Sequence, residues 1–106
     1  DKMGYHPYTF AIFGAMADKD IDGVLKPMMD LVDYWYCTDL LTARAAKASD
    51  LAKQIRLLGK EAEVFSGAGS AYQMALDKAG EGDRIVVFGS FYTVAGVMAY
   101  RNNQAH

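Results

Sequence analysis

The chain has 106 residues, of which 52% are hydrophobic and 23% are charged, and its formal net charge is −2. This length suits one compact domain, so we expect residues 1–106 to form a single domain. No run of about 18 apolar residues occurs, and the sequence therefore predicts no membrane-spanning helix. Lysines and arginines are dispersed along the chain, which argues against a nucleic-acid partner.

The sequence has few residues suited to metal binding or disulfide chemistry. The single cysteine, Cys37, cannot form an intrachain disulfide, and its aromatic and apolar neighbours indicate a buried, inert thiol. A reducing compartment is then expected, which favours a cytoplasmic location. The two histidines, His6 and His106, lie near the termini and provide no metal-ligand spacing, so we expect no metal site in this chain.

The first third of the chain is typical of a strand, a helix and a second strand. Tyr8–Ala15 is a short apolar run of strand formers, which predicts a strand buried on both faces. Asp20 is placed to cap a helix over Ile21–Leu31, and Pro27 predicts that this helix is kinked or divided in two. Val32–Thr38 is dense in aromatic residues and predicts the second strand.

The middle of the chain continues the alternation. Ala46–Leu58 has apolar residues on one helical face and predicts a helix, with a start signal at Ser49–Asp50. Glu61–Phe65 is a short alternating run that predicts a strand. Ser70 then offers a cap for a helix over Ala71–Ala79.

The last part completes the pattern with a buried strand at Ile85–Phe88 and a helix at Phe91–Arg101. Alternating strands and helices imply right-handed crossovers and a mostly parallel sheet. We therefore expect an α/β fold with three layers, α/β/α, in which a sheet of at least four strands has helices on both faces.

The turn Gly89–Ser90 is the strongest candidate for a functional site. It follows the buried strand Ile85–Phe88, and ligands of parallel sheets bind outside the carboxyl ends of the strands. Gly89 permits a sharp turn, and Ser90 stands where a helix begins, which suits a carboxylate or a phosphate. The alternative is that Ser90 is only a helix cap. The chain offers no histidine and acid partners for Ser90, which argues against a hydrolase triad.

A second candidate is the loop Asp18-Lys19-Asp20, which follows the first predicted strand. Two carboxylates that flank a lysine could orient a nucleotide or contact another domain. The alternative is a polar loop in which Asp20 caps the next helix. The glycine-rich segment Gly67–Ser70 lacks the spacing of a phosphate-binding P-loop, and we interpret it as a turn.

Three segments, taken in order, resemble one known family. Ile12–Ile21 contains A-M-A-D-K-D after a strand, Asp33–Cys37 reads D-Y-W-Y-C, and Phe88–Met98 reads F-G-S-F-Y-T-V-A-G-V-M. Each is similar to a motif of the bifunctional dihydrofolate synthase/folylpolyglutamate synthases, which have the Mur ligase fold. The resemblance covers about residues 8–100 and implies a C-terminal domain of the Mur ligase type.

The resemblance implies an ATP-dependent ligase that adds L-glutamate to folate or dihydropteroate. Such enzymes activate the carboxylate of the acceptor as an acyl phosphate, which the amino group of glutamate then attacks with the help of Mg²⁺. Their ATPase domain is N-terminal and is absent from this sequence. ATP and Mg²⁺ are therefore cofactors of the full-length enzyme, and we expect no cofactor bound to this fragment and no activity of the fragment alone.

The resemblance also implies roles for particular residues. The serine of the closing motif is Ser90, so Ser90, Gly89 and Tyr92 are predicted to bind the substrate glutamate. Asp18, Lys19 and Asp20 are predicted to bind the nucleotide or to help the two domains close. The resemblance assigns no catalytic residue and no metal ligand to this chain.

The family's C-terminal domain opens with a strand that ends in an Asp-x-x-His-Asn-Pro motif, and this sequence begins after it. We therefore expect a central strand and its helix to be missing, and we expect an exposed sheet edge that permits an artefactual dimer. Two alternatives remain open: a free-standing flavodoxin-like binding module without catalysis, and the C-terminal domain of a peptidoglycan Mur ligase.

Overall fold

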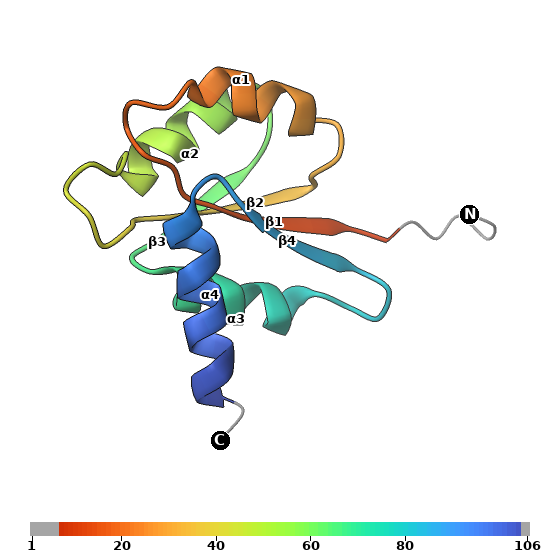
Figure 1. Cartoon of the computed structure of the whole chain (residues 1–106). Coiled ribbons are helices and arrows are strands. Elements are labelled where there is room, and N and C mark those ends of the chain that lie inside the picture. The colour runs from red at the N-terminus through yellow and green to blue at the C-terminus, as the bar shows by residue number, and fades with distance from the viewer. Residues whose placement is uncertain (1–6, 105–106) are drawn as a thin grey trace.

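The structure, a computed structural model, describes residues 7–104 as a four-stranded sheet between two layers of helices. All strand pairs are parallel, and the strand order is β3-β2-β1-β4. The helices α1 and α2 cover one face, and α3 and α4 cover the other (Figure 1). The predicted three-layer α/β fold is confirmed. The elements are β1 (Thr9–Phe13), α1 (Ile21–Leu25), η2 (Lys26–Met28), β2 (Tyr34–Thr38), α2 (Ala48–Leu57), β3 (Ala62–Phe65), α3 (Ala68–Lys78), β4 (Arg84–Phe88) and α4 (Phe91–Gln104).

The strand register brings the ends of three strands level with one another. Phe13, the last residue of β1, is paired with Cys37 of β2 on one side and with Phe88 of β4 on the other. The loops that follow these strands therefore begin at one edge of the sheet. The four strands form one continuous sheet, so any further strand could join it only beyond β3 or β4.

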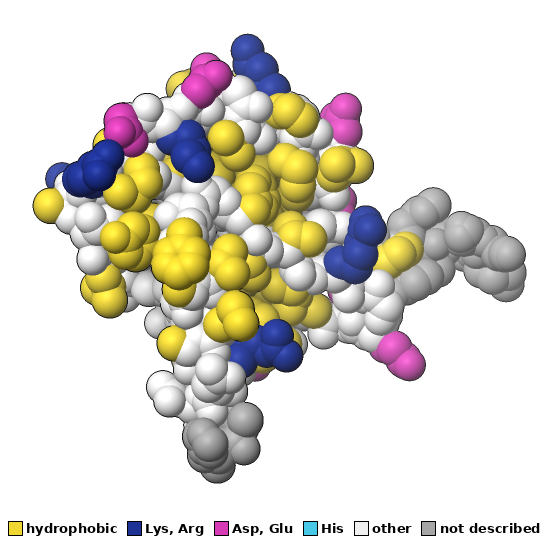
Figure 2. Space-filling view, in the orientation of Figure 1, with side chains coloured by type: hydrophobic (Ala, Val, Ile, Leu, Met, Phe, Trp, Pro, Cys, Tyr) yellow, Lys and Arg dark blue, Asp and Glu magenta, His cyan; other side chains and the backbone are white. Residues whose placement is uncertain are grey.

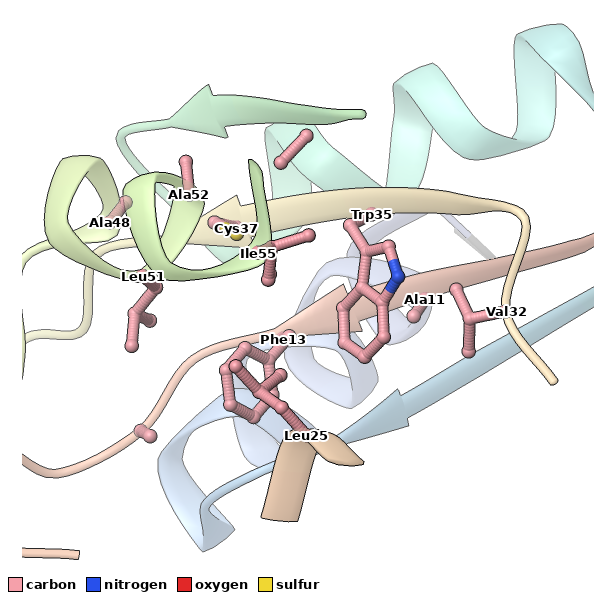
Figure 3. Close-up of a cluster of buried hydrophobic side chains, with 12 residues drawn as sticks. Ala11, Phe13, Leu25, Val32, Trp35, Cys37, Ala48, Leu51, Ala52 and Ile55 are labelled. Carbon is pink, nitrogen blue, oxygen red and sulfur yellow. The ribbon is translucent and has the colours of Figure 1, made fainter. Parts of the chain in front are cut away.

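The core beneath α1 and α2 is built around aromatic rings. Trp35 and Phe13 are fully buried, with ring centroids 5.8 Å apart, and Phe88 lies 5.1 Å from Phe13. Leu25 of α1 and Leu51 of α2 pack into the same cluster (Figure 3). Complete burial of each such side chain stabilises the fold by about 1.5–3 kcal/mol, so this cluster fixes both helices to the sheet.

The opposite core holds α3 and α4 closely. Phe10, Ile12 and Tyr36 point from the sheet toward small residues of α3. A Cβ atom added at Gly96 of α4 would lie 3.0 Å from the Cβ atom of Ala68, so the two helices approach at a point where a side chain on α4 would crowd the contact.

Among the residues that the structure describes, no helix is both long and apolar enough to cross a bilayer.

The helix predicted over Ile21–Leu31 is divided in two. Helix α1 ends at Leu25, and the 3₁₀ turn η2 has Pro27 near its start. Proline lacks the amide hydrogen that would continue the α-helical pattern. The predicted cap is present, because the carboxylate of Asp20 accepts a hydrogen bond from the amide of Gly23 at 3.2 Å.

Two predicted helix starts are wrong. Helix α2 begins at Ala48, so Ser49–Asp50 lie inside its first turn, and the amide of Ala48 donates to the distant carboxylate of Asp39 at 2.7 Å. Helix α3 begins at Ala68, and Ser70 is a residue of its first turn. In both cases the N-cap side chain makes no hydrogen bond, which is why the local sequence misplaced the start.

The β4 edge of the sheet is open and apolar among the described residues. The apolar residues Ile85–Phe88 are only half-buried, and Figure 2 shows hydrophobic side chains gathered across this face. The amide of Arg84 donates to the carbonyl of Tyr8, the residue before β1, at 2.8 Å. Because amides alternate in direction along a strand, the amides of Ile85 and Val87 point toward the open edge.

Candidate functional site

Gly89 turns the chain sharply at the end of β4. Its φ angle is +108°, which L side chains rarely adopt. A Cβ atom at this position would overlap the carbonyl oxygen of Gly14 and lie 2.8 Å from the ring of Phe13. Glycine is therefore required here both by the backbone conformation and by the close approach of the β1 end.

Ser90 is the N-terminal cap of α4. Its Oγ accepts a hydrogen bond from the amide of Tyr92 at 3.0 Å, and its carbonyl accepts one from the amide of Thr93 at 3.1 Å. The cap uses a lone pair of the hydroxyl and leaves its hydrogen free to donate. The structure thus contains the cap that residue types alone suggested, and the hydroxyl retains a donor for a ligand.

Thr93 fastens this turn to the end of β1. Its side chain is fully buried, and its hydroxyl donates to the carbonyl of Gly14 at 2.8 Å across a sequence separation of 79 residues. Sequence reasoning placed Thr93 inside the closing motif but gave it no role. The only sequence signal for this role was the position of Thr93, in the first turn of a helix that begins at the edge of the sheet.

The two candidate loops meet in space. The ammonium of Lys19 donates to the carbonyl of Gly89 at 3.1 Å. Since β1 and β4 are adjacent parallel strands, the loops after them start at the same edge. The structure therefore brings Asp18, Lys19 and Asp20 beside the Gly89–Ser90 turn, although 70 residues separate the bonded pair in the chain.

The members of the Asp18-Lys19-Asp20 loop have different surroundings. Asp18 forms an ion pair with Arg44 at 3.1 Å, and both side chains are about 70% exposed. Asp20 caps α1 instead. Lys19 is bonded to the Gly89–Ser90 turn through its ammonium. This separation supports the capping alternative for Asp20 and leaves Asp18 and Lys19 as the groups that could meet a ligand.

The loop between β2 and α2 is a third component that sequence reasoning did not assign to the site. The amide of Ala17 donates to the carbonyl of Arg44 at 2.8 Å, and the amide of Ala46 donates to Ala15 at 2.9 Å. The loop after β1 is thereby held against the loop after β2. An arginine in a loop after the neighbouring strand was the only sequence signal for Arg44.

Tyr92 lies beside a separate pocket. It is 48% exposed and lines a pocket of about 460 Å³ between α4 and the loops that follow β2 and β3. Leu40 and Gly67 line the same pocket, whereas Gly89 and Ser90 do not. Of the three predicted substrate-binding residues, Tyr92 therefore lines this pocket, and Gly89 and Ser90 do not.

The described residues contain no group of three or more histidine, cysteine, aspartate or glutamate side chains that could hold a metal ion. His6 and His106 lie outside the described residues. Burial raises the pKa of Cys37 to about 12, an effect that the nearby Arg56 partly offsets, so the thiol stays protonated and inert as predicted.

The fold is an α/β domain with a parallel sheet, and its candidate loops converge at the carboxyl edge of that sheet, where ligands of such folds bind. Residues 2–91 match the family described as Mur ligase, glutamate ligase domain. The chain belongs to this family.

Its relatives include dihydrofolate synthase/folylpolyglutamate synthases. The enzyme of that name from Buchnera aphidicola subsp. Baizongia pistaciae is 33% identical over 95 residues, which is 90% of this chain and 22% of the relative. The structure of E. coli FolC with DHPP and ADP superposes with a TM-score of 0.88 at 31% identity, over 98% of this chain and 24% of that one.

A further solved structure is a bifunctional folylpolyglutamate synthase/dihydrofolate synthase with Mn, AMPPNP and L-glutamate bound. It superposes with a TM-score of 0.82 at 38% identity, over 91% of this chain and 23% of that one. The chain thus spans less than a quarter of the length of these relatives. The resemblance seen in the three sequence motifs is confirmed.

Proposed function

We propose that this chain is the C-terminal, glutamate-ligase domain of an ATP-dependent ligase that adds L-glutamate to folate or dihydropteroate. The observation that carries the proposal is the contact between Lys19 and the Gly89–Ser90 turn at the carboxyl edge of the sheet. It joins the first and last family motifs into one surface. The names of the relatives, and the L-glutamate in one of their structures, support the same reaction.

We assign the Gly89–Ser90 turn to the substrate glutamate. The hydroxyl hydrogen of Ser90 is a free donor at the N-terminus of α4, where the helix dipole favours a carboxylate. The ammonium of Lys19, 3.1 Å from the Gly89 carbonyl, adds positive charge beside them. Tyr92, at the edge of the adjoining pocket, would contact the remainder of the substrate.

We assign the Asp18–Asp20 loop, together with Arg44, to the nucleotide side of the cleft and to its closure. The ion pair between Asp18 and Arg44 holds the guanidinium near the sheet edge, where it could meet a phosphate. Mg²⁺ would neutralise phosphate charge in the complete enzyme. The described residues offer no ligand cluster for it, so we expect its ligands outside this chain.

In this reaction the chain would position groups rather than carry a proton. The amino group of glutamate attacks the acyl phosphate of the acceptor and displaces phosphate. Binding of the glutamate carboxylate at Ser90 would fix the direction of that amino group, which lowers the entropic part of the barrier. The inert Cys37 is compatible with a reducing, cytoplasmic location, which we also propose.

Two substitutions at Ser90, made in a ligase that contains this chain, separate the cap from the binding role. Ser90→Ala removes both, and the loss of one hydrogen bond to a charged carboxylate, about 1.5–3 kcal/mol, should raise the KM for glutamate on the order of 10- to 100-fold. Ser90→Asp keeps a good cap but places a negative charge beside the substrate carboxylate. It should preserve the melting temperature and raise the KM for glutamate at least as much.

The KM for ATP is the internal control, and it should change less than the KM for glutamate in both variants. An unchanged KM for glutamate in the Ser90→Asp enzyme would contradict the assignment. The function itself is tested by a chimaera in which residues 7–104 replace the matching segment of the E. coli relative. A folded chimaera that binds ADP but ligates no glutamate would refute the proposed function. Turnover by the isolated chain would instead refute only the expectation that the chain is inactive by itself.

A further inference from the structure

A second pocket lies at the opposite end of the sheet from the candidate site. Its volume is about 480 Å³, within the range of small-ligand pockets, and it opens at the amino ends of the strands. Residues just before or at the start of β1, β2, β3 and β4 line it. Its aromatic members are Tyr8, Phe10, Tyr34 and Tyr36.

The aromatic rings form an angled wall. Phe10 and Tyr34 are stacked with centroids 4.9 Å apart, and Tyr8 meets Tyr34 edge-on at 5.6 Å. Tyr36 is tilted against Phe10 at 6.0 Å. Tyr8 and Tyr34 remain 48% and 36% exposed, so ring surface is available to a ligand although Phe10 and Tyr36 are buried.

The charges around the wall are predominantly negative. Three carboxylates, those of Glu61, Glu63 and Asp83, line the pocket with one ammonium, that of Lys78. Asp83 uses both oxygens to accept backbone amides, from Tyr8 at 2.8 Å and from a turn residue at 2.7 Å. Within residues 7–104, Glu61 and Glu63 form no salt bridge, so their charge is not neutralised by a close partner.

We propose that this pocket binds an organic cation, an alkylammonium or a guanidinium group. Ring faces attract cations through their quadrupole, and a cation between aromatic rings and carboxylates gains from both. An anion would meet the two unpaired glutamates, and a neutral ligand would leave their charge unused. The source could be a small quaternary ammonium compound or an arginine or lysine side chain of another protein.

The environment of Tyr36 supports this electrostatic description. Burial is the main cause that raises the pKa of its hydroxyl, and the charge of Glu63 and the neighbouring Tyr34 raise it further. Tyr36 therefore stays neutral at physiological pH, and the negative charge of the pocket comes from its carboxylates. The pocket shares no residue with the carboxyl-edge site, so the inference is independent of the proposed ligase function.

The test compares choline with 3,3-dimethyl-1-butanol, its neutral analogue of equal shape, in amide chemical-shift titrations of the 106-residue chain at constant ionic strength. We expect saturable shifts with choline, with a Kd on the order of 1 mM, at the amides of Tyr34, Tyr36 and Glu63. Butylguanidinium is titrated in parallel. Tighter binding of choline would indicate a small ammonium ligand, and tighter binding of butylguanidinium would indicate an arginine side chain.

Three variants test how the charged side chains of the pocket contribute to binding. Glu63→Gln should weaken choline binding about threefold, and Lys78→Met, which removes the competing ammonium, should tighten it about twofold. Asp50→Asn, on the other face of the sheet, is the matched control and should change nothing. Equal shifts with the neutral analogue, or no saturation with any cation, would overturn the proposal. A Glu63→Gln variant that binds choline as tightly as the Asp50→Asn control would also overturn it. If a variant fails to fold, the comparison of choline with its analogue decides.

Discussion

Substitution of Gly89 by alanine tests the close approach on which the site depends. The φ angle of +108° costs an L side chain about 1–2 kcal/mol. The new Cβ atom would also overlap the carbonyl oxygen of Gly14, so β4 and β1 must move apart at this point. That movement would break the buried hydrogen bond from Thr93 to Gly14, which costs about 1–3 kcal/mol more. We expect a total loss of about 2–5 kcal/mol.

Gly59→Ala is the matched control. Gly59 also has a positive φ angle, +92°, but no atom lies within 4 Å of the position that its Cβ would occupy. This variant should lose only the conformational part, about 1–2 kcal/mol. Urea unfolding, followed by the fluorescence of the single, buried Trp35, measures both. The midpoints should differ by about 1 M or more. Equal losses in the two variants would refute the steric part of the reasoning.

Three further predictions concern stability and association. Thr93→Val keeps the side-chain shape but leaves the Gly14 carbonyl without its buried donor, so it should cost about 1–3 kcal/mol in urea unfolding, with Thr93→Ser recovering part of the loss. Hydrogen bonds from backbone amides, first that of Tyr8, lower the pKa of Asp83. The contribution of Asp83 to stability is therefore complete above the unfolded-state pKa of about 3.9 and is lost as the pH falls through the folded-state pKa. Asp83→Asn should therefore reduce the loss of stability at acid pH in a pH–stability curve. An unchanged acid limb would contradict a stabilising role of the Asp83 carboxylate. We also propose that the open β4 edge pairs with the same edge of a second copy of the isolated chain. Sedimentation should then show a dimer, and Val87→Lys should abolish it. A monomer of the unmodified chain at all protein concentrations would argue against this pairing.

Much of the fold could be predicted because the local patterns are strong. The buried run Thr9–Phe13 and the aromatic run Tyr34–Thr38 are both strands, within two residues of the predicted bounds. Pro27 marked the division of the second element correctly. These features depend on residue types over a few positions, which a sequence displays directly.

The starts of α2 and α3 could not be predicted from their own residues. The amide that opens α2 is capped by Asp39, nine positions earlier and on the far side of a loop. Helix α3 begins after Gly67 with no side-chain cap, so nothing polar marks its start. Capping by a distant side chain and starts without a cap are both decided by tertiary packing, which overrides the local preference of Ser49 or Ser70 for the first position.

The candidate site shows the same division between local and distant information. Gly89 and Ser90 were recognisable as a turn and a cap, because both roles depend on adjacent residues. The partners that make this turn a site come from elsewhere: Lys19 bonds the Gly89 carbonyl, and Thr93 bonds Gly14. Both contacts exist only because β1 lies next to β4, an order that alternation of strands and helices does not specify.

The adjacency of β1 and β4 also limits what the site can do alone. Lys19 is held to a backbone carbonyl, which neutralises no charge, so its ammonium keeps a full positive charge at the sheet edge. Asp18, in contrast, is already paired with Arg44. A ligand at this edge would therefore meet the positive charge of Lys19 and the hydroxyl donor of Ser90, but no cluster of described residues that could hold a metal. Under the proposed function, such a surface would bind the substrate carboxylate and orient it, and the groups that activate the acceptor would come from outside the described residues.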